Sequence, residues 1–124
     1  MATPVAVKAI EAKSFASPDE VRTPSKTRVE VNHIQGFTLG RFHLDPGWRW
    51  SECIKPVAKT DTCQISHVGC AISGRLTVQL QDGTKKTISA GECYAIPPGH
   101  EAWVEGNEKF VAIEVLSAEQ YAKG

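Results

Sequence analysis

Two histidines in the second half of the chain have the chemistry of metal ligands. His67 precedes the turn signal Ser73-Gly74, and His100 follows directly on a Pro-Pro-Gly run. Neutral imidazole is the commonest nitrogen ligand for iron, zinc, copper and nickel. The two side chains can share one ion only if the fold brings their segments together, so the elements around them decide the question.

Those elements are predicted to be short antiparallel strands. Between Gln64 and Trp103, runs with roughly alternating apolar and polar residues are cut by Ser-Gly, Asp-Gly, Ala-Gly and Pro-Pro-Gly. These are turn signals, because glycine adopts positive φ and proline fixes its own φ. Residues 28–34, 37–44 and 109–116 also read as strands. The sequence therefore predicts an all-β domain.

Within this stretch the sequence resembles the cupins, a family of small β-barrels with two signature motifs. The second motif is matched by Gly91, Pro97, Gly99 and His100, with a turn shorter than usual. In the first motif, the slot of the family's glutamate falls on His67, and the usual His-x-His pair is absent. The resemblance covers about residues 36–116. It implies a cupin-type barrel, or double-stranded jelly roll, in which both histidines point into the barrel mouth, and it implies a homodimer.

A third ligand has two candidates. Glu52 lies near the place of the missing His-x-His pair and would give two histidines and one carboxylate with open positions. Cys63 lies four residues before His67, so its side chain would point the same way on a regular strand. A thiolate would favour zinc or copper over oxygen-activating iron. The metal expected is a divalent ion, Fe, Zn, Ni or Mn. Alternatively, the barrel binds no metal and His67 and His100 are polar groups in its cavity.

Four further residues are candidates for the wall of a ligand pocket. Trp50 and Trp103 either line the cavity or fill a small barrel as core residues, and pockets for small molecules are mostly apolar and aromatic. Arg49 either binds a ligand carboxylate or stacks on an indole. Tyr94 is expected at the cavity rim.

Composition narrows the possible partners. The chain has 124 residues, enough for one domain, with 14 Lys and Arg against 14 Asp and Glu. This balance gives no reason to expect a nucleic-acid partner, and no apolar run is long enough to suggest a membrane span. The expected location is the cytoplasm. The cysteines, which show no zinc-ribbon or Cys-x-x-Cys spacing, are expected to be buried reduced thiols: Cys53, Cys63, Cys70 and Cys93.

The predicted boundaries are an N-terminal arm at 1–27, the barrel at 28–116 and a short C-terminal helix at 117–124. Within the arm, residues 5–10 are expected to form an edge strand, and residues 17–22 a single helical turn, because serine, proline and acids favour a helix start. Trp50 and Glu52 are expected on one face of a strand, followed by a surface loop at 54–61.

The function expected from the sequence is that of a small stand-alone cupin that binds a divalent metal and a small organic ligand. Oxygenase, isomerase or lyase chemistry would then use the metal as Lewis acid or oxygen carrier, with Glu52 or Glu101 moving a proton. The alternative is a metal-free, non-catalytic module that binds or senses a small molecule. Fold alone cannot choose between enzyme and binding module.

Overall fold

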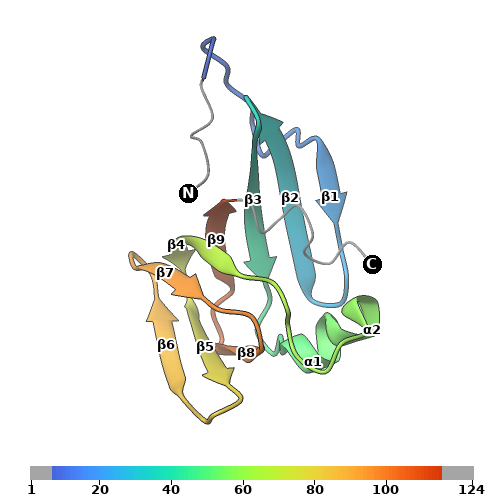
Figure 1. Cartoon of the computed structure of the whole chain (residues 1–124), viewed down its shortest axis with the longest axis vertical. Helices are drawn as coiled ribbons and strands as arrows, with labels where there is room; N and C mark the ends of the chain where they lie inside the picture. The colour runs from blue at the N-terminus through green and yellow to red at the C-terminus, as the bar shows by residue number, and fades with distance from the viewer. Residues whose placement is uncertain (1–6, 116–124) are drawn as a thin grey trace.

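Two antiparallel sheets enclose the core of the protein in a computed structural model that describes residues 7–115 (Figure 1). Within this range, the strand order of the large sheet is β1 (Glu20–Arg22), β2 (Thr27–Ile34), β3 (Phe37–Leu44), β9 (Phe110–Val115), β4 (His67–Ser73) and β7 (Cys93–Ile96). The order of the small sheet is β6 (Lys85–Ser89), β5 (Arg75–Leu80) and β8 (His100–Glu105). Two short helices lie between β3 and β4, namely α1 (Trp50–Cys53) and α2 (Lys55–Ala58). The all-β jelly-roll prediction is confirmed.

Alternation along the strands explains how the chain fills this barrel. In β3 and β8, every second residue is buried and the residues between are partly exposed. The same alternation runs through β9, where Phe110, Ala112 and Glu114 are buried. Successive side chains of a strand point to opposite faces, so each of these strands has one face toward the interior. Glu114 is thus a carboxylate on the buried face of β9, where apolar side chains are the rule.

Gly74 takes the chain from the large sheet to the small one. It connects β4 to β5 with a φ of +76°, a conformation that residues with a side chain rarely adopt. A Cβ atom at this position would also lie 2.4 Å from the carbonyl oxygen of Lys109. The turn predicted at Ser73-Gly74 therefore depends on glycine for both conformation and space.

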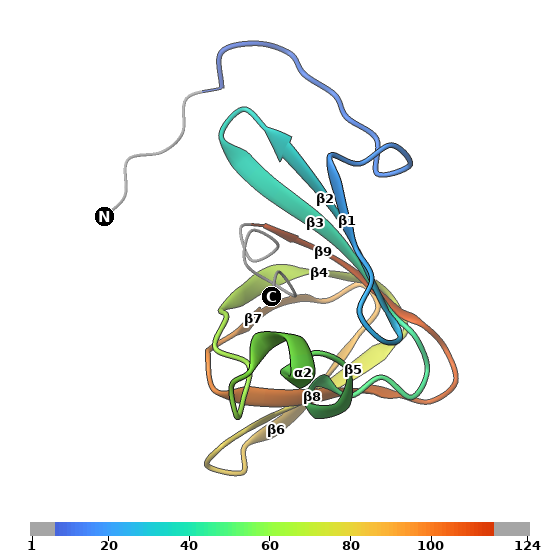
Figure 2. The same ribbon diagram turned by 90° about the vertical axis from the view of Figure 1, so that its right-hand side faces the viewer.

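The segment after β3 differs from the prediction. Instead of a strand and a surface loop, residues 50–58 form α1 and α2, with Pro56 in the first turn of α2, where a missing N–H is tolerated. Trp50, Cys53 and Ile54 are buried, at the i, i+3, i+4 spacing of one helix face. Burying such large apolar side chains contributes roughly 1.5–3 kcal/mol each, which favours these helical turns over an exposed loop. Figure 2 shows the two helices packed against one side of the barrel.

The N-terminal arm also differs from the prediction. The helical turn expected at 17–22 is wrong, because residues 20–22 form β1 and pair with β2. Asp19 contributes to this arrangement, since its carboxylate accepts a hydrogen bond of 2.9 Å from the backbone N–H of His33. Residues 7–10 of the predicted edge strand are not in a strand, and its first two residues lie outside the described range. The predicted C-terminal helix lies outside it as well.

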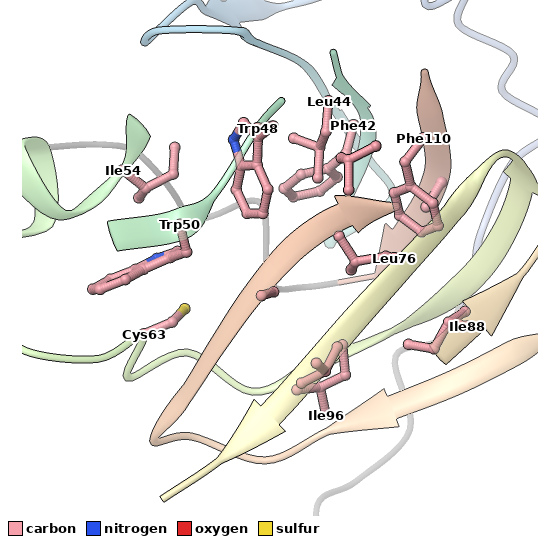
Figure 3. Close-up of a cluster of buried hydrophobic side chains, with 14 of the residues drawn as sticks. Phe42, Leu44, Trp48, Trp50, Ile54, Cys63, Leu76, Ile88, Ile96 and Phe110 are labelled. Atoms are coloured by element: carbon pink, nitrogen blue, oxygen red, sulfur yellow. The ribbon is translucent and has the colours of Figure 1, made fainter. Parts of the chain in front are cut away.

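The core contains aromatic and aliphatic side chains from both sheets and from α1. Figure 3 shows Phe42, Leu76 and Phe110 in the barrel, with Trp50 at one end of the cluster. Within residues 7–115, no helix combines the length and apolar character needed to cross a bilayer.

Candidate metal centre

Three potential metal ligands, Cys63, His67 and His100, meet in the barrel interior. His67 is the first residue of β4 in the large sheet, and His100 is the first residue of β8 in the small sheet. Cys63 forms an isolated antiparallel bridge with His100, in which the Cys63 N–H donates to the His100 carbonyl at 3.0 Å. The backbone position of each of the three residues is therefore set by strand or bridge hydrogen bonds.

The distances fit one ion. The three residues are 2%, 5% and 3% exposed in chain order, and their ligand atoms lie within 4.8 Å of one another. Cys63 Sγ is 3.5 Å from His67 Nε2, and the two imidazole centroids are 5.2 Å apart. Ligand atoms around a tetrahedral zinc ion lie about 3.3–3.8 Å apart when the bonds to the metal are about 2.0–2.3 Å long. The donor set of one sulfur and two nitrogens is also one that zinc accepts.

Glu114 orients His67 from the side away from Cys63. Its Oε1 lies 2.7 Å from His67 Nδ1, and its Oε2 accepts a short hydrogen bond from the Tyr94 hydroxyl. A carboxylate only accepts, so His67 Nδ1 carries a proton and Nε2 is left to face Cys63. Metal-binding histidines typically have such a carboxylate partner, which fixes the ring and raises its basicity.

Gly69 gives Glu114 the room to do this. It lies opposite Glu114 in the β4–β9 register. A Cβ atom at position 69 would lie 2.4 Å from the Ile113 carbonyl oxygen and 2.7 Å from Glu114 Cγ. The absence of a side chain therefore lets β9 approach β4 closely enough for Glu114 to reach His67.

His100 is oriented in a similar way by the main chain. Its Nδ1 lies 2.7 Å from the carbonyl oxygen of Pro97, which can only accept a hydrogen bond. Nδ1–H is therefore the donor, and Nε2 is the nitrogen available to a metal. The Pro-Pro-Gly turn thus holds the histidine that follows it.

The negative thiolate of Cys63 and the positive imidazolium of His67 stabilise each other. Burial would raise the pKa of Cys63, but hydrogen bonds with His100 and His67 outweigh it and lower the pKa to about 6. Burial would lower the pKa of His67, but the Glu114 charge and the hydrogen bonds with Cys63 and Glu114 raise it to about 10. Near neutral pH, the metal-free centre is a row of thiolate, imidazolium and carboxylate. An incoming metal would bind the thiolate and displace the His67 proton.

A small cavity of about 30 Å³ adjoins the histidines. Apart from Glu114 and the two histidines, its lining is apolar and aromatic and includes Trp48 and Trp50. The Trp50 Nε1–H is buried and has no hydrogen-bond partner among the described residues, whereas the Trp48 Nε1–H donates to Thr27 at 2.9 Å. A buried donor without a partner costs about 1–3 kcal/mol. Trp50, labelled at one end of the cluster in Figure 3, therefore brings a free N–H donor to the wall of this cavity.

The two predicted histidines are brought together, and of the two candidate third ligands only Cys63 joins them. Glu52 is exposed, because in the helical turn α1 it lies between the buried Trp50 and Cys53 rather than on a strand face shared with Trp50. The expectation for Glu52 assumed a strand that does not form.

The remaining predicted pocket residues lie elsewhere. The Arg49 guanidinium stacks 4.5 Å from the ring centroid of Trp103, which favours the stacking alternative, and neither residue lines the cavity beside the histidines. Glu101 accepts hydrogen bonds from the backbone N–H groups of Ser51 and Ala102, so it ties α1 to β8. Tyr94 contributes indirectly, through its bond to Glu114.

Sequence reasoning missed Glu114. The signal was present, because Phe110, Ala112 and Glu114 share one phase of a strand, and an acidic residue in the apolar phase predicts a buried partner. Its partner could not be read from the sequence, since β9 pairs with both β3 and β4 only in the folded sheet.

The fold is shared with several solved structures. A Rhizobium leguminosarum protein of unknown function matches with a TM-score of 0.60 and 21% identity, covering 87% of this chain and 96% of the other. The cupin domain of Schizosaccharomyces pombe Cnp3 matches with a TM-score of 0.57 and 12% identity, over 84% of this chain and 71% of that one. The chain has the cupin fold. The polyketide cyclase RemF from Streptomyces resistomycificus is also similar, with a TM-score of 0.56, 15% identity and coverage of 86% and 80%.

No protein-family model and no curated protein sequence matches the chain. At these identities the solved structures show the cupin fold alone, and the chemistry has to be argued from the residues of this chain. In the structure, the predicted second motif spans β7 and its connection to β8, and its histidine is the first residue of β8.

Proposed function

We propose that this cupin binds one divalent metal ion through Cys63, His67 and His100 and presents it to a small ligand in the barrel. One observation carries the proposal: three buried donor atoms converge, and both histidines have their second nitrogen occupied by a fixed acceptor. In known metal sites, a histidine that binds the metal through one ring nitrogen typically donates the other N–H to a carboxylate or a backbone carbonyl, as both histidines do here.

The donor set favours zinc among the candidate metals. A thiolate and two imidazoles suit zinc or copper, whereas manganese prefers oxygen ligands. Zinc sites closed by four protein ligands are structural, and sites with three protein ligands keep a position open for water or substrate. Among the described residues only three donors converge here, so the site belongs to the open type.

The ligand would occupy the cavity beside the histidines. Its apolar lining excludes bulk water, and the Trp50 N–H offers one hydrogen bond to an oxygen or nitrogen acceptor. A bound metal would supply Lewis-acid chemistry. The pair of Glu114 and His67 holds a proton at Nδ1, and the neighbouring Tyr94 hydroxyl keeps the carboxylate in place. The polyketide cyclase among the similar structures shows that this fold can carry an enzyme. The chemistry we propose for this chain is of the isomerase, lyase or oxygenase kind.

A second function is favoured by the order of the same side chains. His67 lies between Cys63 and Glu114 and contacts both, which is the arrangement of a catalytic triad of thiol, base and carboxylate. Such a triad would act without metal. The Cys63 residue is only 2% exposed, so a substrate larger than the cavity cannot reach its sulfur. Burial and the convergence of His100 therefore favour the metal site. A metal-free binding or sensing module remains the rival class.

The test is the metal content of the purified, untagged protein, measured by elemental mass spectrometry. We expect about one metal per chain, lost in Cys63→Ser, His67→Ala and His100→Ala and retained in His33→Ala, whose side chain is half-exposed. Cobalt(II) should add a sulfur-to-metal charge-transfer band that Cys63→Ser abolishes. A folded protein that takes up no zinc, iron, nickel, copper or manganese would rule the metal site out and leave the metal-free module.

A further inference from the structure

A pair of exposed thiols lies on the large sheet. Cys70 of β4 and Cys93 of β7 are directly opposite each other in the antiparallel register, and their sulfur atoms are 2.8 Å apart. Both residues are exposed, so the expectation of four buried thiols is wrong for these two. Neither belongs to the group of converging donors, Cys63, His67 and His100.

The backbone geometry suits a covalent bond between them. The N–H of Ala71 donates to the carbonyl of Glu92 at 2.9 Å, so the adjacent Cys70 and Cys93 form a non-hydrogen-bonded pair of the ladder. In such pairs the Cα atoms lie about 4.5 Å apart and the side chains lean together. Disulfides span Cα distances of about 4.4–6.8 Å. The bond can therefore form with little movement of either strand.

Access is also favourable. β7 is an edge strand of the large sheet, as Figure 1 shows, so one side of the pair is not covered by another strand of the described chain. The pKa of Cys70 is raised because its thiol is hydrogen-bonded to Cys93 and partly desolvated. Reaction at Cys70 should therefore accelerate as the pH rises, since the thiolate is the nucleophile.

We propose that Cys70 and Cys93 are a redox-active dithiol, which a low-molecular-weight disulfide such as glutathione disulfide oxidises to a cross-strand disulfide. One cysteine thiolate attacks glutathione disulfide, giving a mixed disulfide and releasing one glutathione thiolate. The second cysteine attacks the protein sulfur of that mixed disulfide and releases the second glutathione. The protein loses two electrons and two protons, and two molecules of glutathione are formed.

The bond would fasten two strands that support the metal centre. β4 begins with His67, and Tyr94 follows Cys93 in β7 with its hydroxyl on Glu114. Oxidation would therefore link β4, which carries the candidate ligand His67, to β7, which carries Tyr94, the hydrogen-bond partner of Glu114. We expect the oxidised protein to unfold at a higher temperature than the reduced protein, because the cross-link restricts the unfolded chain.

The experiment treats the full-length protein with glutathione disulfide, alkylates the remaining thiols under denaturing conditions and determines masses. The expected product has two of its four thiols alkylated, no glutathione adduct and a peptide cross-link between Cys70 and Cys93. Cys93→Ser should instead keep a stable glutathione adduct on Cys70, because the resolving thiol is gone. Four alkylated thiols, a lasting glutathione adduct on the unmodified sequence, or disulfide-linked dimers would overturn the proposal.

Thermal unfolding tests the fastening of the strands. Glutathione disulfide should raise the Tm of the protein and leave the Tm of the double variant Cys70→Ser/Cys93→Ser unchanged. A confirmed cross-link that leaves the Tm unaltered, or lowers it, would overturn the fastening role.

Discussion

At the scale of single residues, the properties of the centre come from what surrounds each donor atom. Glu114 and the Pro97 carbonyl each accept a hydrogen bond from the Nδ1–H of one histidine, so Nε2 is the nitrogen that each ring can offer to a metal. The same contacts keep a proton on His67 and a charge on Cys63 in the metal-free protein. Binding of a metal by these donors would therefore release a proton.

Metal affinity should rise with pH. Since the pKa of Cys63 is about 6 and that of His67 about 10, one proton, from His67, must leave on binding between these values. The apparent affinity for zinc should then increase about tenfold per pH unit across this range, and more steeply below about 6, where the thiol is also protonated. Titrations with a competing chelator at several pH values measure the slope. An affinity independent of pH would contradict the proton balance described here.

Trp50→Phe should weaken binding of a small anion to the cobalt-loaded protein. The change removes the buried N–H that has no partner in the described chain and keeps an aromatic ring in the wall. Azide affinity, followed by the visible cobalt bands, should fall about tenfold or more, as for a lost hydrogen bond to a charged group. Trp48→Phe is the matched control, because the Trp48 N–H is already bonded to Thr27. Equal losses in the two variants would show that ring size, and not the N–H, matters.

At the scale of the elements, the β2–β3 hairpin depends on a buried carboxylate. Glu30 of β2 faces Arg41 and His43 of β3 at 2.6 and 2.8 Å, and Arg28 lies 3.1 Å away. Burial would raise the pKa of Glu30, but the hydrogen bonds with Arg41, His43 and Arg28 outweigh it and lower the pKa to about 2. The stabilisation is present above the unfolded value of 4.5 and is lost as the pH falls toward 2.

Glu30→Gln should lower the free energy of unfolding by about 2–4 kcal/mol at neutral pH, because Arg28, Arg41 and His43 lose the charged acceptor that they share. The difference between the two proteins should shrink as the pH falls from 4.5 toward 2, where Glu30 itself becomes protonated. Urea unfolding at a series of pH values gives both quantities. Glu108→Gln, an exposed change of the same charge, should have little effect at any pH. A constant difference down to pH 2 would mean that the charge of Glu30 is not the cause.

At the scale of the whole molecule, the three ligands connect the two sheets. His67 comes from the large sheet, and His100 and its bridge partner Cys63 come from the edge of the small one. A bound ion would therefore stabilise the closed barrel against unfolding.

Removing the metal should lower the Tm. A ligand at one hundred times its Kd stabilises the folded state by about 2.7 kcal/mol, which corresponds to a Tm change of about 10 °C for a domain of this size. Thermal scans of the metal-loaded protein with and without a chelator measure the change, and His100→Ala should show none. A Tm that chelation leaves untouched in the parent protein would contradict a metal that joins the sheets.

The sequence predicted the strands of the barrel better than the helical turns beside them and the contacts of the buried polar residues. Turn glycines and strand alternation are local signals, so most strands from β2 to β9 could be read from them. The placing of His67 and His100 in the barrel was implied by the resemblance to cupins. The helical turns at 50–58 were missed, because their formation is decided by burial of Trp50 and Ile54 in the assembled barrel. Glu114 was missed because its contact with His67 depends on pairing between distant strands.

The position of β9 has a consequence for how the protein is made. This strand is the last one described, yet it lies between β3 and β4 and pairs with both, so the large sheet has no continuous ladder until it arrives. It also brings Glu114, the carboxylate partner of His67. On the ribosome, the half-sheets on either side would keep unpaired edges until β9 has been synthesised. His67 would therefore lack its carboxylate partner until β9 has joined the sheet.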